Sequence, residues 1–166
     1  MDFLIVLAAK YLYLVIIIVA TVAILVYKKT FVKRSILKLA VISLPLAFVI
    51  ARISSFFIYT SRPFVVENVK PLIDHAPNNG FPSDHTLLAM TISAVFLIYE
   101  RRLGILLTAL GLAVGAARVL ARVHWPIDIM GSTIIAFSAV IIAWIILERV
   151  KFANSFIDKI LSKFKI

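Results

Sequence analysis

The sequence predicts an all-α fold, a polytopic membrane helical bundle of about five transmembrane helices followed by a C-terminal amphipathic helix. Hydrophobic residues make up 63% of the 166 residues, whereas an ordinary soluble domain has roughly 45–50% even when Gly is counted. These residues fall into five long apolar runs, and most basic residues lie between or beside the runs. A soluble core of this length cannot hide so much apolar surface, so the composition favours a bilayer as the environment.

The five runs approach the roughly 20 mostly apolar residues that a transmembrane helix needs. They cover residues 3–27, 36–59, 86–99 with an extension back to 83, 103–121 and 127–147. The first run follows Asp2 rather than a basic region. It is also longer than the roughly 7–15 apolar residues of a secretory signal, so we expect a membrane span there.

Two segments differ from the runs. Residues 60–82 are rich in Pro, Asn and Gly, which indicates ordered turns rather than another span. Residues 150–166 place apolar side chains at helical spacing with lysines between them, which predicts a basic amphipathic helix on an anionic membrane surface. A solubilising tail is the alternative. We therefore expect a transmembrane domain at 1–149, with site motifs within 52–128, and a basic amphipathic tail at 150–166.

The formal net charge of +10 is explained by membrane orientation. With five spans, twelve of the 18 Lys and Arg residues fall on one side and six on the other. The positive-inside rule places the twelve in the cytoplasm, so we expect the N-terminus outside and the C-terminus inside. The basic excess then needs no nucleic acid, and we expect no nucleic-acid partner.

The same topology gathers the reactive side chains on the outer side. Charged groups in or beside a span are costly unless they pair or line a polar cavity, so they are functional candidates. The outer side receives His75, His85, His124, Arg52, Arg62, Arg118, Arg122, Asp84 and Asp128.

Two candidate groups lie at helix boundaries. Arg62 precedes Pro63 where the second run ends, and its fork of donors matches a phosphate or carboxylate. The alternative is an interfacial arginine that reaches the lipid headgroups. Ser83 suits the N-cap of the next helix and Asp84 its positive end, while His85 can face an anion bound there. Capping alone explains Ser83 and Asp84, but it does not explain His85.

The third group surrounds the last turn. Arg118 ends the fourth run, and Asp128 lies four residues after His124. A carboxylate at that spacing can accept the imidazole N–H and fix its tautomer, although a purely structural hydrogen bond is the alternative. A Ser-His-Asp hydrolase would use one serine, one histidine and one acid. The two histidines and two arginines found here instead suit chemistry on a phosphate. We expect no metal and no other cofactor, because the histidines lack compact ligand spacing and the arginines repel a cation. The chain has no cysteine, which excludes a thiol nucleophile.

These residues, in this order, resemble the phosphatidic-acid-phosphatase type 2 superfamily over about residues 50–130. Its first motif is a Lys seven positions before Arg-Pro, and its second is Pro-Ser-x-His. The third is Ser-Arg followed by a His, with five residues between the Arg and the His, and then an Asp, with three residues between the His and the Asp. The matching residues are Arg62, Pro63, Pro82, Ser83, His85, Arg118, His124 and Asp128. Ser55 stands where Lys is usual, and Ala117 where Ser is usual. Arg52, one helical turn before Ser55, can supply the missing phosphate contact unless it only reaches lipid headgroups.

The resemblance implies a role for each residue. His124 attacks the terminal phosphorus and forms a phosphohistidine, Asp128 orients His124, and His85 protonates the leaving oxygen and then activates water. No metal takes part. The phosphate oxygens are held by Arg62, Arg118, Ser83 and the backbone N–H groups at the start of the next helix, where Asp84 lies. Arg52 is our own addition to this set.

Residues 61–65 and 76–86 are most similar to bacterial undecaprenyl pyrophosphate phosphatases. This implies hydrolysis of undecaprenyl pyrophosphate at the bacterial inner (cytoplasmic) membrane, with the site facing the periplasm or cell exterior. The runner-up is a phosphatase of the same superfamily that acts on the 1-phosphate of lipid A or on phosphatidylglycerophosphate. A transporter or lipid-binding scaffold is the alternative from another class. We expect the lipid phosphate and membrane lipids as partners and no obligatory protein partner. The role of His75 stays open between a gate, a cap and a turn residue.

Overall fold

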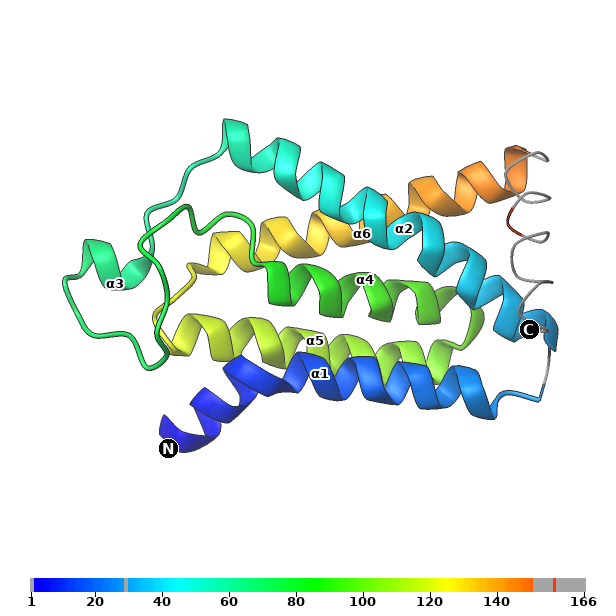
Figure 1. Ribbon diagram of the computed structural model, residues 1–166, viewed down its shortest axis with the longest axis horizontal. Coiled ribbons are helices and arrows are strands. Elements are labelled where there is room, and N and C mark those ends of the chain that lie inside the picture. Colours follow the sequence, from blue (N-terminus) through cyan, green and yellow to red (C-terminus); the bar gives the residue numbers. More distant parts are fainter. Residues whose placement is uncertain (1, 29, 151–156, 158–166) are drawn as a thin grey trace.

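The protein is a bundle of long helices that run roughly parallel or antiparallel to one another (Figure 1). The structure is a computed structural model, and it describes residues 2–28, 30–150 and 157. Within these residues all regular structure is helical, which confirms the predicted fold class. The helices are α1 (Asp2–Val26), α2 (Thr30–Phe57), α3 (Pro63–Val66), α4 (Asp84–Tyr99), α5 (Arg101–Leu120) and α6 (Pro126–Arg149). The amphipathic tail lies outside the described residues, apart from Val150 and Ile157, so it stays a prediction.

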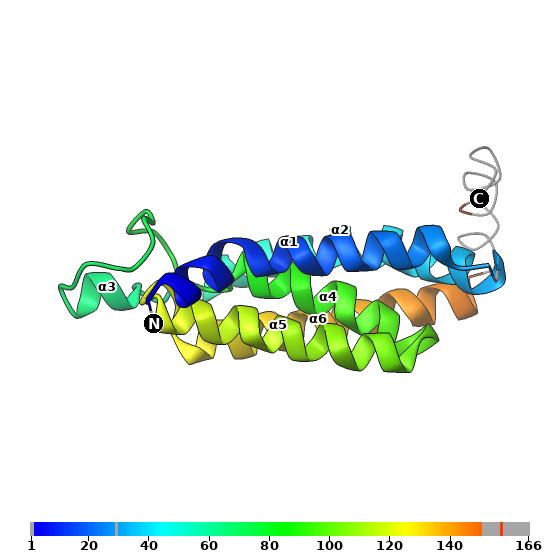
Figure 2. The same cartoon turned by 90° about the horizontal axis from the view of Figure 1, so that it is seen from below.

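In the described part of the chain, four helices are long and apolar enough to cross a membrane: α1, α2, α5 and α6. The remaining expected span, the third apolar run, is the shorter helix α4, which has 16 residues. At 1.5 Å per residue it is about 24 Å long, less than the roughly 30 Å of a hydrocarbon core. Figures 1 and 2 show that α4 begins inside the bundle, short of the level where α5 ends. The first turn of α4 is therefore recessed below the end of the bundle that carries α3.

Helix α4 is the centre of the packing and contacts α1, α2, α5 and α6. Its buried positions include Met90, Val95 and Phe96, each at most 2% exposed. Glycines let α5 approach it closely. A Cβ at Gly104 would lie 2.4 Å from the backbone nitrogen of Leu97, a distance that real Cβ atoms essentially never show. The missing side chain at Gly104 thus allows the backbones of α5 and α4 to pack closely.

The helix boundaries follow the apolar runs with one clear difference. Helix α2 begins at Thr30 rather than at 36, because the turn that carries Lys33 and Arg34 continues the helix beyond its apolar part. Helix α6 begins at Pro126, as its favourable first position predicts. Hydropathy locates the membrane-embedded part of a helix and not the polar turns that extend it.

The 60–82 connection folds as ordered turns with one short helix, α3, and contains no further span, as expected. It is tied to the turn after α5, because the N–H of Phe64 donates to Arg122 O (3.2 Å) and that of Leu72 to Ala121 O (3.2 Å). Ile73 packs with Ala9, Ala117 and other residues in a small core cluster. The loop is thereby fixed over the ends of α1 and α5.

Candidate active site

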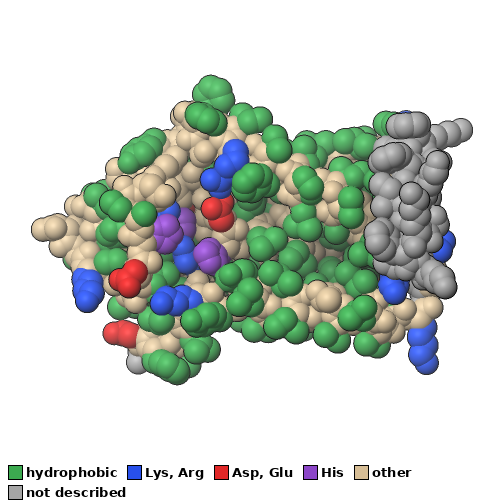
Figure 3. Space-filling view, in the orientation of Figure 1, with side chains coloured by type: hydrophobic (Ala, Val, Ile, Leu, Met, Phe, Trp, Pro, Cys, Tyr) green, Lys and Arg blue, Asp and Glu red, His purple; other side chains and the backbone are tan. Residues whose placement is uncertain are grey.

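A polar cavity of about 250 Å³ lies where the 60–82 loop meets the start of α4. Its position is visible in Figure 3, where histidine and arginine side chains gather at the α3 end of a surface otherwise rich in hydrophobic groups. The predicted candidates His124, His85, Arg62, Arg118, Asp84 and Arg52 all line it. The other lining residues are Ser55, His75, Asn78, Asn79, Phe81 and Pro82. Residues from α2, the loop, α4, α5 and the α5–α6 turn therefore converge on one site.

His124 lies in the turn between α5 and α6 and is 2% exposed. Its Nδ1 is 2.9 Å from the carbonyl oxygen of Gly80, and 3.4 Å from Oδ2 of Asp128. Because both of these groups accept hydrogen bonds, the proton belongs on Nδ1 and the lone pair on Nε2. Burial lowers the pKa of His124, and the cations of Arg118 and Arg62 lower it further, while Asp128 opposes them. The imidazole is thus neutral near pH 7, which leaves the lone pair of Nε2 available.

Nε2 of His124 faces two guanidinium groups. NH1 of Arg62 and NH2 of Arg118 each lie 3.4 Å from this nitrogen. One lone pair cannot accept two good hydrogen bonds, and both distances exceed the usual range of roughly 2.7–3.2 Å. The two cations therefore converge beside Nε2 without being neutralised by it, which suits a bound anion.

Arg62 is 5% exposed and is held from several sides. Its Nε and NH2 donate to Oδ1 of Asn78 at 3.0 and 2.9 Å. NH1 donates to the carbonyl of Val123 at 2.7 Å, and NH2 to that of Asn79 at 3.2 Å. These bonds fix the plane of the guanidinium, so Arg62 is a structured part of the site and not an arginine that reaches out to headgroups.

Arg118, in the last turn of α5, is 3% exposed. Its NH1 donates to the carbonyl of Ala9 on α1 at 3.4 Å. Its Nε is buried and has no hydrogen-bond partner among the described residues. An unpartnered donor on a buried cation is costly, and an anion in the cavity would satisfy it.

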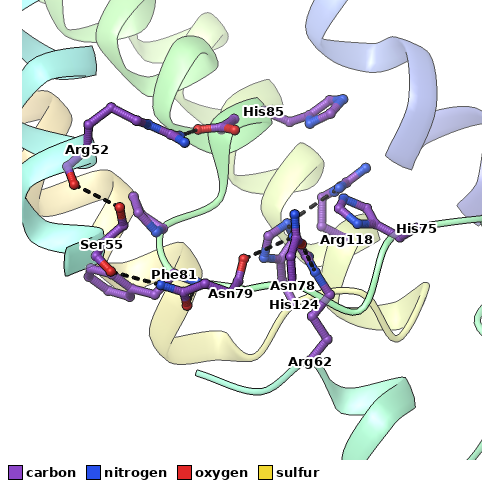
Figure 4. Close-up of a pocket in the computed structure, with 12 residues that line it drawn as sticks. Arg52, Ser55, Arg62, His75, Asn78, Asn79, Phe81, His85, Arg118 and His124 are labelled. Carbon is purple, nitrogen blue, oxygen red and sulfur yellow. Dashed lines mark hydrogen bonds and ion pairs between the residues drawn. The ribbon is translucent and has the colours of Figure 1, made fainter. Parts of the chain in front are cut away.

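His85 and Asp84 occupy the first turn of α4. Figure 4 shows His85 directed away from His124, toward α1, and its ring meets the edge of Tyr13 at 4.6 Å between centroids. Asp84 forms an ion pair with Arg52, whose guanidinium also lies 5.1 Å from the ring centre of Phe48. Arg52 therefore reaches the cavity beside Ser55, as expected, but the role of replacing the motif Lys stays a prediction.

Ser83 and Asp128 lie behind the lining, and both are 0% exposed. Ser83 occupies the N-cap of α4, but its side chain makes no capping bond within the described part of the chain. Its backbone N–H already donates to Oγ of Ser132 at 2.8 Å. The predicted contact of Ser83 with phosphate is thus not prepared here in the way that the arginine contacts are, and it stays a prediction.

Several site residues had only weak signals in the sequence. The ring of His75 lies 6.1 Å from that of His124. Burial and the charge of Arg62 lower the pKa of His75 to about 4. Asn78 and Asn79 read as turn residues, yet they hold Arg62. The asparagine pair could have been suspected from its position between two motifs, but nothing local indicated its partners.

The arrangement supplies the imidazoles of His75, His85 and His124 and the buried guanidinium groups of Arg62 and Arg118 around one polar space. Among residues 2–28, 30–150 and 157, no three His, Cys, Asp or Glu side chains gather as metal ligands. The donors present match the oxygens of a phosphate, because guanidinium forks and N–H groups are what such an anion binds.

Comparison with known proteins agrees with this chemistry. A family model described as the PAP2 superfamily matches residues 40–152. The chain is 36% identical over 100 residues to undecaprenyl-diphosphatase BcrC of Bacillus subtilis (strain 168), a match that covers 60% of this chain and 50% of that protein. The chain spans about half the length of the curated relatives it matches.

Two solved structures share the fold. Aquifex aeolicus LpxE superposes with a TM-score of 0.68 at 22% identity, covering 86% of this chain and 84% of that one. The first transmembrane PAP2 type phosphatidylglycerolphosphate phosphatase from Bacillus subtilis gives 0.59 at 19% identity, covering 89% and 74%. Because the family match includes α4, α5, α6 and every lining residue of the cavity, the chain belongs to the PAP2 superfamily.

Proposed function

We propose that this chain is an integral membrane lipid phosphatase that removes the terminal phosphate of a lipid pyrophosphate through a phosphohistidine. The observation that carries the proposal is the position of His124 Nε2, 3.4 Å from both Arg62 NH1 and Arg118 NH2. A terminal phosphoryl group placed between these groups has its phosphorus facing the lone pair and its oxygens facing the cations. No other residue type is needed to bind and attack it.

In the first step Nε2 of His124 attacks the terminal phosphorus. The Nε2–P bond forms, and the bond from phosphorus to the bridging oxygen breaks. His85 donates a proton to that oxygen, while Arg62 and Arg118 stabilise the charge on the phosphoryl oxygens. In the second step a water attacks phosphorus, His85 takes a proton from it, and phosphate leaves as the Nε2–P bond breaks.

We propose undecaprenyl pyrophosphate as the main substrate, because the curated relative at 36% identity is named an undecaprenyl-diphosphatase. Phosphatidylglycerophosphate is a second candidate, because one solved structure with this fold is named a phosphatidylglycerolphosphate phosphatase. Lipid A 1-phosphate remains the other alternative that the sequence suggests. The membrane is the bacterial inner membrane, with the cavity facing the periplasm or the cell exterior.

The test is a phosphate-release panel with purified protein in detergent and EDTA present, using undecaprenyl pyrophosphate, lipid A and phosphatidylglycerophosphate. We expect the highest kcat/KM for the pyrophosphate and no loss of rate in EDTA. In His124→Ala we expect turnover to fall by a factor on the order of 10⁴ or more, with no acid-labile phosphoprotein. Unchanged hydrolysis in that variant would favour the transporter or scaffold alternative.

Orientation is tested with single cysteines, since the chain has none of its own. Lys70 in the loop and Arg101 at the start of α5 are both exposed and lie toward opposite ends of the bundle. A membrane-impermeant maleimide should label Lys70→Cys in intact cells and Arg101→Cys only after lysis. The reverse pattern would place the cavity on the cytoplasmic side.

A further inference from the structure

The nearest acceptor for the Nδ1 proton of His124 is a backbone carbonyl. Gly80 O lies 2.9 Å from Nδ1, inside the usual range of roughly 2.7–3.2 Å. Oδ2 of Asp128 lies 3.4 Å away, which is longer than a good hydrogen bond. The carboxylate that the sequence assigns as the orienting group is thus the more distant of the two.

The oxygens of Asp128 are also committed elsewhere. Oδ1 accepts a hydrogen bond from the hydroxyl of Thr60 at 2.7 Å, and Oδ2 accepts one from the N–H of Trp125 at 2.9 Å. Asp128 therefore joins the end of the α2–α3 connection to the start of α6. Its negative charge remains close to His124, but its shortest bonds hold the surrounding backbone.

Thr60 links both acceptors. Its hydroxyl bonds to Asp128, and its carbonyl accepts the N–H of Gly80 at 2.9 Å. Its own N–H donates to Oδ1 of Asn79 at 3.0 Å. Asn79 in turn donates to the carbonyls of Ser55 and Ile58, at 3.1 and 2.9 Å, at the end of α2. The N–H of Gly80 is thereby tied, through Thr60 and Asn79, to the end of α2 and the start of α6.

A side chain at position 80 would be crowded. A Cβ there would lie 3.0 Å from Oγ1 of Thr60, 3.1 Å from Oδ2 of Asp128 and 3.2 Å from Thr60 O. Two of these atoms belong to Thr60 and one to Asp128, so a Cβ would press by a few tenths of an ångström on atoms that make the bonds just described. The glycine therefore allows close packing of its backbone against the network.

We propose that the Gly80 carbonyl sets the tautomer and direction of the His124 ring, and that Thr60 is the positioning residue: its hydroxyl bond to Asp128 fixes its own backbone, whose carbonyl holds the N–H of Gly80. Asp128 anchors the same network and supplies charge. The inference rests on the proposed function, because it explains how the Nε2 lone pair is aimed at phosphorus.

The first experiment compares Thr60→Val, which keeps the shape and removes the hydroxyl, with Thr60→Ser, which retains it. Thr108→Val is the matched control, because the hydroxyl of Thr108 bonds within α5 to Gly104 O. We expect kcat of Thr60→Val to fall about 10- to 100-fold with little change in KM, since a displaced reactive group costs up to about 10² in rate. Thr60→Ser should restore most of the loss, and Thr108→Val should match the wild type.

The second experiment reads the tautomer directly. The chain has three histidines, so ¹⁵N-histidine labelling gives few imidazole signals, and His75→Gln and His85→Gln identify that of His124. We expect a proton on Nδ1 in the wild type, and a mixture of tautomers in Thr60→Val and Gly80→Ala. A proton on Nε2 in the wild type would overturn the inference even if both variants fail to fold.

The outcomes separate this inference from the function on which it rests. A wild-type protein that releases no phosphate from any lipid of the panel would end the proposed function. An active wild type with an equally active Thr60→Val would end the role of Thr60 and leave the phosphatase proposal untouched.

Discussion

On one side of the cavity, Arg62, Arg118 and His124 are between 2% and 5% exposed and bond to backbone carbonyls. On the α2 side, the side chains of Arg52 and Asp84 are 44% and 62% exposed and pair with each other. The buried side is built before substrate arrives, because its groups have few alternative positions. The exposed side is adjustable, since a solvent-accessible ion pair contributes only about 0–1 kcal/mol. We therefore expect buried-side changes to act on kcat and exposed-side changes on KM.

Among the changes that compare the two sides of the cavity, the largest effect should come from Arg118→Lys. Lysine keeps the charge but lacks the fork, so the Nε donor that is buried without a partner in the described structure is lost. We expect kcat for phosphate release to fall about 10²-fold, comparable to removal of one donor that stabilises developing charge. Arg122→Lys is the control, because Arg122 pairs with Glu67 outside the cavity lining. Equal rates in the two variants would remove the distinction between buried and exposed cations.

Tyr13→Leu should have the next largest effect. The edge of this ring packs on His85 at 4.6 Å, so its loss frees the group proposed to protonate the leaving oxygen. We expect kcat to fall about 5- to 10-fold, a modest misplacement cost, whereas Tyr13→Phe keeps the ring and the rate. Wild-type kcat in Tyr13→Leu would show that α1 does not position His85.

A smaller effect is expected from Arg52→Ala on the exposed side. We expect KM to rise about three- to fivefold with kcat nearly unchanged, which corresponds to roughly 1 kcal/mol of binding. Arg52→Lys should retain most of the affinity. Normal KM and kcat in Arg52→Ala would dispose of the idea that Arg52 stands in for the Lys missing at Ser55.

The smallest effect is a pH shift. Burial lowers the pKa of His124, so its neutral, attacking form persists as the pH falls below the ordinary value of about 6.5. The acid limb of kcat/KM should therefore lie below that pH. Asp128 raises the His124 pKa, through its side-chain contact first and its charge second, so Asp128→Asn should move the limb to still lower pH, on top of any loss in rate. A shift to higher pH in that variant would contradict this assignment.

The comparison between the two sides also marks where sequence reasoning succeeds. Hydropathy locates the long helices, because burial in lipid is encoded residue by residue. The placement of Pro126 at the start of α6 follows from local helix preferences, whereas Ser83 occupies the N-cap of α4 without the capping bond on which that preference rests. The convergence of Arg62, Arg118 and His124 follows from topology and motif order together.

What sequence reasoning misses is non-local hydrogen bonding. Asp128 lies four residues from His124, so it is the obvious orienting group, whereas Gly80 lies 44 residues away and carries no side chain to suggest a role. Thr60 reaches Asp128 across 68 residues. A backbone carbonyl is present at every position of a chain, so only its place in the fold gives it significance.

The site depends on contacts from helix α1, which lies outside the residues that the family model matches. The match begins at residue 40, yet Ala9 accepts a bond from Arg118 and Tyr13 packs on His85. A shortened chain that starts at the family boundary would retain every motif and lose two of the supports beneath them. Anyone trimming this protein, or transplanting its motifs into another scaffold, should carry the first helix along.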